Sequence, residues 1–277
     1  DYVSLAHEKG LKVWGLVDNF TQDISTYEVL SRTSSRQNLV SQLVNAAVGA
    51  GIDGINVDFE QLSEDVGVHF LEFLRELSIE CHKNNLVLSV DNPVPEDFTS
   101  HYDRAEQGKV VDYVIIMGYD EHNGSSLEAG SVSSYEFVKE GIEETIKEVP
   151  AEKVISGIPF FTRLWSETPK TQEELNQEAG TEAADYPMKV TSEALGMSTA
   201  RDKISQAGAE TTLDETTGNN YATWEADGVT YEIWLEDATS IEPKLQLMKE
   251  NKLAGTAAWA LGQESSDIWD LILKYVN

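Results

Sequence analysis

Six short apolar segments recur along the chain, and the stretches between most of them have the spacing of amphipathic helices. Strands that alternate with helices form right-handed βα units around a parallel sheet. Strands that are apolar almost throughout are covered on both faces. The pattern therefore predicts an α/β fold with strands in LKVWGLVDN (11–19), GINVDFE (54–60), LVLSVDNPV (86–94), DYVIIMGYDE (112–121), KVISGIPFF (153–161) and LAGTAAWAL (253–261).

The intervening stretches carry their apolar residues at helical spacing, so each predicts a helix with one buried face. These stretches are 37–50, 66–83, 133–148, 242–251 and 265–276. In the first, the predicted buried face is Leu39, Leu43, Ala46 and Ala47, and in the second it is Phe70, Phe73, Leu74 and Leu77.

The alternation stops between Trp165 and about Val229, where the chain becomes polar. SEALGMSTARDKISQAG (192–208) is helix-like, and two β-rich runs flank Asp227-Gly228, which is a strong hairpin signal. We therefore predict a small α+β insertion over 166–236, set into an α/β domain made of 1–165 and 237–277.

Six βα units are two short of an eight-stranded barrel, and the chain opens on a helical pattern, DYVSLAHEKG. A (β/α)8 TIM barrel that lacked two strands would expose long unpaired edges. We therefore expect the first two barrel strands to lie upstream of Asp1. An open doubly wound sheet is the alternative, because six strands suffice for it.

Composition excludes several classes of partner. The formal net charge is -29, so the chain has little with which to neutralise nucleic-acid phosphates or an anionic membrane surface. Cys81 is the one cysteine, so no disulfide forms within the chain. No apolar stretch reaches membrane-span length, and no signal peptide opens the chain, although a removed targeting segment is compatible with it.

The second apolar run carries polar residues at every second position, which a folding argument alone does not explain. In a strand, Asn56, Asp58 and Glu60 share one face, while Ile55, Val57 and Phe59 share the other. In a barrel the apolar face meets the helices, and Glu60 arrives last, at the carboxyl end where active sites lie. Asp58, ~6–7 Å away along the strand, should raise the pKa of Glu60, as a general acid requires.

The residues Asp53-Gly54-Ile55-Asn56-Val57-Asp58-Phe59-Glu60 resemble the catalytic signature D-G-x-D-x-D-x-E of family 18 glycoside hydrolases. Asn56 stands where the family has its middle Asp; it can donate a hydrogen bond to Asp58 but cannot share a proton. MGYD (117–120), GIPFFTRLW (157–165) and GTAAWALGQE (255–264) resemble the family's motifs on its sixth, seventh and eighth strands. VWGLVDNF (13–20), DGINVDFE (53–60), SVDNPVP (89–95) and GIPFFTRLW (157–165) most resemble the bacterial subgroup of spore-cortex and cell-wall lytic enzymes, whose catalytic domain often follows LysM repeats.

The resemblance implies a retaining, substrate-assisted hydrolysis in which the 2-acetamido oxygen of the sugar attacks C1 and forms an oxazolinium ion. Glu60 would be the acid and then the base, Asp58 would orient the acetamido group, and the Tyr119 hydroxyl would bind its carbonyl. Trp259 would form the floor under the −1 sugar. Substrate contacts are also implied for the remaining candidates, which are Met117, Asp120, Asn56, Asn92 and Arg163. Arg163 could equally anchor the insertion, and Asn92 could equally be a turn residue before Pro93.

The implied substrate is peptidoglycan or spore cortex, cleaved at β-1,4 bonds after N-acetylglucosamine, with chitin or chito-oligosaccharides as the alternative. A non-catalytic glycan-binding relative, which would usually lack the acid, and a barrel enzyme for a phosphorylated substrate are further alternatives. No cofactor is expected, and the scattered histidines predict no metal site. The expected location is secreted, at the bacterial cell envelope or spore coat. The sequence leaves open endo or exo cleavage and the oligomeric state.

Overall fold

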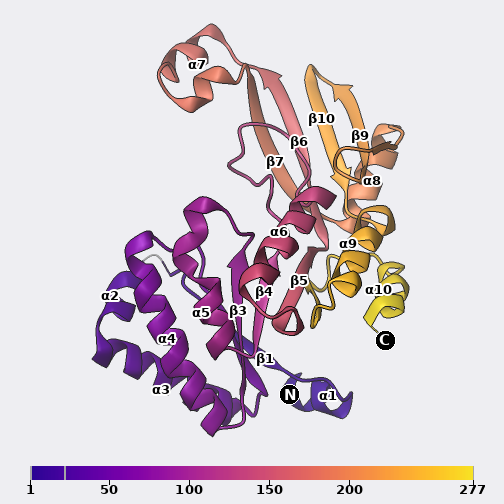
Figure 1. Ribbon diagram of the computed structural model, residues 1–277. Coiled ribbons are helices and arrows are strands. Elements are labelled where there is room, and N and C mark those ends of the chain that lie inside the picture. Colours follow the sequence, from indigo (N-terminus) through magenta and orange to yellow (C-terminus); the bar gives the residue numbers. More distant parts are fainter. Residues whose placement is uncertain (1, 22, 277) are drawn as a thin grey trace. The chain divides into compact units, whose positions relative to one another are not determined.

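The computed structural model describes residues 2–21 and 23–276, and its contacts divide the chain into two compact units (Figure 1). The first unit comprises Asp1–Met117, Gly141–Ile155 and Lys252–Ala254. The second comprises Gly118–Glu140, Ser156–Asn251 and Gly255–Asn277. Two elements, α6 (Tyr135–Glu148) and β5 (Val154–Pro159), contribute residues to both units.

The first unit is built on parallel strands in the order β1-β2-β3-β4. Their register places Asp18 opposite Asp58, Asn56 opposite Ser89, and Pro93 opposite Met117. All four strands therefore present their carboxyl ends at one edge, as predicted for βα units. Their bounds are β1 (Trp14–Asp18), β2 (Gly54–Asp58), β3 (Val87–Pro93) and β4 (Tyr113–Met117).

Helices of the first unit lie along one face of this sheet, where α3, α4 and α5 contact β2, β3 and β4 (Figure 1). The predicted buried face of the long helix α4 is confirmed, because Phe70, Phe73, Leu74 and Leu77 are all buried. The helices of this unit are α1 (Tyr2–Glu8), α2 (Thr26–Ser31), α3 (Thr33–Ala50), α4 (Glu64–Lys83), η1 (Asp97–Tyr102), α5 (Arg104–Val110) and η2 (Ala151–Lys153).

The buried face of α3 differs from the predicted one. The structure buries Val40, Val44 and Ala47, whereas Leu39 and Leu43 are half-buried and Ala46 is exposed. The reason is that apolar residues cover a wide arc of this helix, so its periodicity does not decide which edge faces inward. Packing of α3 against both α2 and α4 selects the buried edge.

The second unit combines the parallel neighbours β5 and β11 with a separate antiparallel sheet in the order β7-β6-β10-β9-β8. The predicted hairpin is confirmed: Ala226 pairs with Val229 across Asp227-Gly228. The strands are β6 (Phe161–Pro169), β7 (Met188–Gly196), β8 (Thr212–Asp214), β9 (Asn219–Ala226), β10 (Val229–Leu235) and β11 (Gly255–Trp259), and the helices are α7 (Gln172–Gln177), η3 (Glu182–Asp185), α8 (Met197–Ala207), α9 (Ala238–Glu250) and α10 (Ile268–Val276).

Two predicted elements of this unit have different bounds. The run KVISGIPFF divides into β5 and the start of β6, so its last residue begins the antiparallel sheet. The segment SEALG, predicted as helix, is the end of β7, because it pairs with β6 from Phe161 to Trp165. Strand pairing is a tertiary interaction, and here it overrides local helix propensity. Only α8 keeps the predicted helix.

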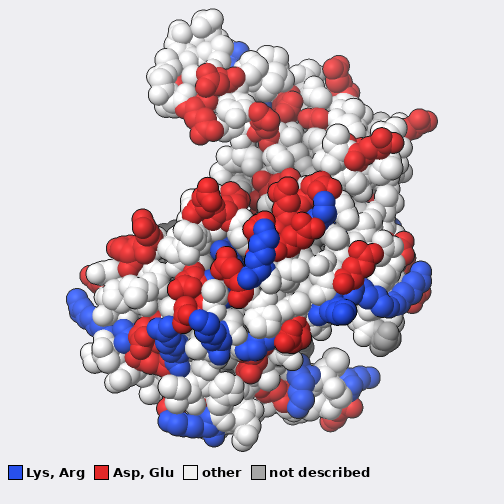
Figure 2. Space-filling model, viewed as in Figure 1, with Lys and Arg blue, Asp and Glu red and all other residues white. Residues whose placement is uncertain are grey.

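Acidic side chains are spread over the visible surface of both units rather than gathered into one tail (Figure 2). Within the part of the chain that the structure describes, no helix is long and apolar enough to cross a membrane.

Candidate active site

The end of β2 separates polar from apolar side chains, as its alternation predicts. Ile55, Val57 and Phe59 are buried, and the Phe59 ring stacks on Phe70 and Phe73 of α4, at centroid distances of 5.7 Å and 5.6 Å. The apolar set therefore faces the helices. Asn56 and Asp58 project from the opposite face of the sheet, at the edge where the strands end.

The amide of Asn56 is committed to the neighbouring strand β3. Its Nδ2 donates to Ser89 Oγ and to Asp91 Oδ1, both at 2.9 Å. A primary amide has two N–H groups, so none is left for Asp58. The predicted hydrogen bond from Asn56 to Asp58 is therefore wrong, because Ser89 and Asp91 on β3 offer acceptors that the motif alone does not reveal.

Asp58 is buried, and no hydrogen-bond partner among the described residues reaches its Oδ1. Burial raises the pKa of this carboxyl group, and the charge of Asp18 raises it further. Asp18 lies opposite Asp58 in the β1–β2 register. The carboxyl group of Asp58 thus has one buried oxygen whose hydrogen-bonding capacity is unused by the described residues.

Glu60 lies two residues beyond the end of β2, half-buried, and the following residue Gln61 has a positive φ of 51°. Asn19 holds its backbone from both sides: the Glu60 N–H donates to Asn19 Oδ1, and Asn19 Nδ2 donates to the Glu60 carbonyl, each at 2.9 Å. The position of Glu60 is therefore fixed by the residue that follows β1. Sequence reasoning missed Asn19, although it follows directly on a strand end.

Tyr102 of η1 supports the same turn. Its hydroxyl donates to the Phe59 carbonyl and accepts from the Leu62 N–H, both at 3.4 Å. Burial raises the pKa of this phenol, and the charges of Glu60 and Asp58 raise it as well. The negative charges of Asp58 and Glu60 thus raise the pKa of a phenol on the neighbouring helix η1.

Asp91 is the second residue that sequence reasoning missed. It lies on β3 next to the amide of Asn56, and its pKa is raised to about 7 by burial and by the charges of Asp58 and Glu60, against a lowering by the Asn56 hydrogen bond. The signal was present in SVDNP, where Ser89 and Asp91 alternate in the same way as Asn56 and Asp58.

Two other candidates of the first unit differ in their surroundings. Asn92 has no exposed surface; its Nδ2 donates to Gln107 Oε1 at 2.7 Å, and its Oδ1 accepts from Gln107 Nε2 at 3.3 Å. It lies within β3 and is hydrogen-bonded to α5, so it is not the turn residue that the sequence offered as one alternative. Met117 ends β4, half-buried, opposite Pro93.

In the second unit, the candidates Tyr119 and Asp120 directly follow Gly118. A Cβ atom at Gly118 would lie 2.9 Å from the Gly157 carbonyl oxygen, so only glycine fits there. The Tyr119 ring packs edge-on against Phe161 at 6.0 Å. Asp120 has a positive φ of 61°, and burial raises the pKa of its carboxyl group while the charge of Arg163 lowers it.

The remaining candidates of this unit lie on strands. Arg163 is on β6, where its Nη1 donates to Ser192 Oγ at 3.0 Å, and among the described residues its buried Nε has no partner. Trp259 ends β11 with 50% of its surface exposed, and its carbonyl accepts from the Phe160 N–H at 2.7 Å. Trp165, two residues after Arg163, is buried and donates from Nε1 to the Gly130 carbonyl at 2.8 Å.

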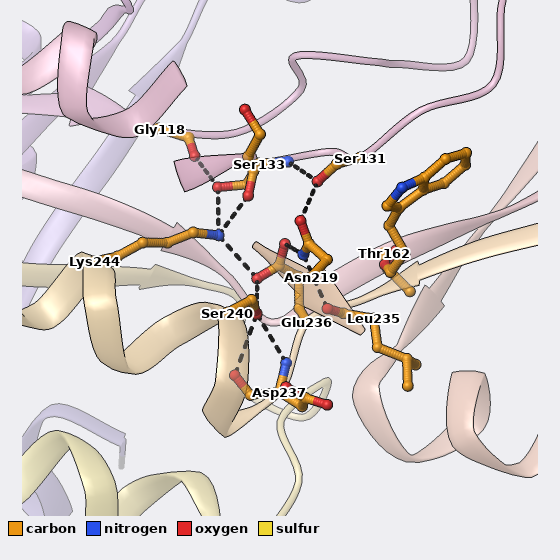
Figure 3. Close-up of polar contacts among 12 residues, drawn as sticks. Gly118, Ser131, Ser133, Thr162, Asn219, Leu235, Glu236, Asp237, Ser240 and Lys244 are labelled. Carbon is orange, nitrogen blue, oxygen red and sulfur yellow. Dashed lines mark hydrogen bonds and ion pairs between the residues drawn. The ribbon is translucent and has the colours of Figure 1, made fainter. Parts of the chain in front are cut away.

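The segment that carries Tyr119, residues 118–134, is held by a buried polar network (Figure 3). Lys244 Nζ donates to the Ser133 carbonyl at 2.6 Å and pairs with Glu236 Oε2 at 3.0 Å. Ser133 Oγ in turn donates to the Gly118 carbonyl at 2.6 Å. Asn219 joins the same network, since it accepts from Ser131 Oγ and donates to Glu236 Oε1.

Among the described residues, no group of three or more His, Cys, Asp or Glu side chains could hold a metal ion. The arrangement at the β2 end is instead suited to proton transfer and to the stabilisation of positive charge, because several carboxyl groups gather around the buried Asp58.

Comparison with known proteins agrees with this chemistry. The family model described as glycosyl hydrolases family 18 matches residues 4–264. The uncharacterized glycosylase YvbX of Bacillus subtilis is 26% identical over 98% of this chain and 77% of its own length. A cortical fragment-lytic enzyme of Bacillus subtilis is 26% identical over 90% of this chain, which spans only 56% of that protein.

Among solved structures, a chitinase from Chromobacterium violaceum superposes with a TM-score of 0.85, at 25% identity, over 99% of this chain and 83% of that one. The likeness confirms the predicted barrel-type α/β fold.

Proposed function

The chain belongs to glycosyl hydrolase family 18, and on that premise we propose that it cleaves β-1,4 bonds after N-acetylglucosamine in peptidoglycan or spore cortex. The similarity to a cortical fragment-lytic enzyme supports this substrate class. The observation that carries the proposal is the carboxyl end of β2, where the buried Asp58, with one oxygen that lacks a hydrogen-bond partner among the described residues, lies two residues before Glu60.

In the proposed mechanism the acetamido oxygen of the sugar in the −1 subsite attacks C1, so no protein nucleophile is needed. Glu60 donates a proton to the leaving glycosidic oxygen and then accepts one from the incoming water. Asp58 orients the acetamido N–H and stabilises the positive charge that develops on the oxazolinium ion. Configuration at C1 is retained, and the sugar must be N-acetylated.

The roles proposed for the second unit come from the motifs to which its residues belong. The Tyr119 hydroxyl donates to the acetamido carbonyl, and Trp259 provides an apolar surface under the sugar ring. Asp120 and Arg163 contact substrate polar groups, and Met117 of the first unit contributes an apolar contact. Asn56 acts through its neighbours, because both its N–H groups are engaged. Asn92 is left out, because it has no exposed surface.

Chitin or chito-oligosaccharides are the second candidate substrate, which the likeness to a chitinase favours. A non-catalytic glycan-binding role is less well supported, because such a protein would not need to retain both Asp58 and Glu60. We further propose that the enzyme acts outside the cytoplasm, at a bacterial cell envelope or spore coat, together with cell-wall-binding domains such as LysM repeats.

The test compares the wild-type chain with Glu60→Gln on peptidoglycan fragments and on chito-oligosaccharides, with released reducing ends as the readout. Loss of a general acid should lower the rate about 10²–10⁴-fold. The matched control is Glu64→Gln, an exposed residue in the first turn of α4, which should leave the rate unchanged. Equal rates for wild type and Glu60→Gln would overturn the mechanism, and binding without cleavage by both would favour the glycan-binding role.

A further inference from the structure

Carboxyl groups gather at the ends of three adjacent strands of the first unit. Asp18 ends β1, Asp58 ends β2 and is followed by Glu60, and Asp91 lies on β3. The sequences of β1, β2, β3 and β4 contain no Lys or Arg, so these strands supply no positive charge to offset the acids. A cluster of this kind in a partly buried site keeps at least one proton near neutral pH.

The geometry singles out Asp91 within this cluster. Its Oδ1 accepts a hydrogen bond from Asn56 Nδ2 at 2.9 Å, and Asn56 is on the same strand face as Asp58. The second N–H of Asn56 goes to Ser89 Oγ at 2.9 Å, so the amide has one fixed orientation between the two strands. Asp91 therefore both holds Asn56 in place and adds a titratable charge beside the proposed catalytic acids.

We propose that Asp91 is a positioning residue of the hydrolase site: its hydrogen bond fixes Asn56 on the strand face of Asp58, and its own protonation state sets the charge beside the proposed catalytic acids. This inference rests on the proposed function and deepens it, because it names the group that controls how the site responds to pH. An ionised Asp91 makes it harder for Glu60 to lose its proton, so the general acid stays protonated to a higher pH.

The groups that face Asp91 support this assignment. Burial raises the pKa of Asp91, and the charges of Asp58 at the end of β2 and of Glu60 just beyond it raise it further, so that it is about 7 despite the lowering by the Asn56 hydrogen bond. Asp18 on β1 acts on Asp58. Two phenols also lie on neighbouring elements. The pKa of Tyr102 of η1 is raised by burial and by the charges of Glu60 and Asp58, and Tyr113 of β4 lies opposite Ser89.

The first test is independent of activity. Carbon NMR of the aspartate carboxyl groups in the whole chain, between pH 4 and pH 9, should show one signal that titrates near pH 7. That signal should vanish in Asp91→Asn, which removes the charge but keeps the shape of the side chain. Persistence of the signal in Asp91→Asn would overturn the assignment.

The second test is the pH profile of kcat/KM on the glycan that the wild-type chain cleaves. In Asp91→Asn the alkaline limb should move to lower pH by about one unit, which is about a tenfold loss of rate on that side. A merely structural role would lower the rate equally at every pH, and that result would refute the proposal.

The exchange variant Asn56→Asp/Asp91→Asn provides the matched control, because it returns one carboxyl group and one amide to the same pair of positions. It should restore a carboxyl signal that titrates near neutral pH and move the alkaline limb back toward higher pH. If the wild-type chain cleaves no glycan, the proposed function fails, while the NMR titration still decides whether Asp91 holds the proton.

Discussion

Replacing Lys244 by methionine should destabilise the second unit by about 3–5 kcal/mol, the cost of leaving one member of a buried ion pair without its partner. The side chains of Lys244 and Glu236 have 1% and 0% of their surface exposed. Methionine has a similar length but no charge, so the Glu236 carboxylate would be left with the neutral donors Asn219 and Ser240 among the described residues.

The magnitude can be tested by urea unfolding, followed by tryptophan fluorescence, and by thermal unfolding. For a chain of this size the loss corresponds to a fall in Tm of roughly 10 °C. Lys83→Met is the matched control, because Lys83 pairs with Glu80 on the exposed surface of α4, with 63% and 42% of their side-chain surfaces exposed. Such a surface pair contributes about 1 kcal/mol or less.

A second substitution separates charge from packing. Adding Glu236→Gln to Lys244→Met removes the unpaired charge and keeps oxygen and nitrogen atoms for the neighbouring hydrogen bonds, so it should recover about half of the lost stability. A loss below about 1 kcal/mol for Lys244→Met, or no recovery in the double variant, would show that the pair does not hold this unit together.

Three further predictions concern the first unit. Asp91→Asn should make the unfolding free energy less dependent on pH. The folded pKa of Asp91 is raised from 3.8 to about 7, so the wild-type chain loses stability as the pH rises through that interval. Urea unfolding at pH 4 and at pH 8 measures this, and the same change in unfolding free energy between the two pH values in both proteins would contradict it. Asn19→Ala removes both side-chain contacts to the Glu60 backbone and should lower kcat about 10- to 100-fold with KM little changed, whereas the exposed Asn45→Ala on α3 should not. Cys81 is buried and its pKa is raised to about 12, so a thiol reagent at pH 8 should label it only in denaturant; rapid labelling of the folded chain would refute its burial.

Much of the fold could be predicted because its patterns are local. Each apolar run contains a strand, and α4 buries the predicted face. Both could be predicted because the periodicity of a strand or a helix depends only on residues close to one another in the sequence. The pairing of SEALG with β6 and the buried edge of α3 could not be predicted, because both depend on elements distant in the sequence.

The candidate site shows the same division. The separation of Asn56 and Asp58 from Phe59 followed from alternation along one strand. Asn19 and Asp91 were missed because each acts across a strand boundary, and the parallel register that brings them to β2 is a property of the sheet. A sequence motif on one strand identifies the functional residues of that strand, but it does not identify the residues of neighbouring strands that hydrogen-bond to them.

The hydrogen bonds that hold residues 118–134 have a kinetic consequence. Ser133 holds this segment at Gly118, Trp165 holds it at Gly130, and Asn219 holds it at Ser131, all within the second unit. A surface loop tied at several points along its length has little freedom left to lose when a ligand arrives. Tyr119 thus lies on a segment whose conformation is already fixed before a substrate binds. We expect turnover to proceed without a slow opening and closing of this loop.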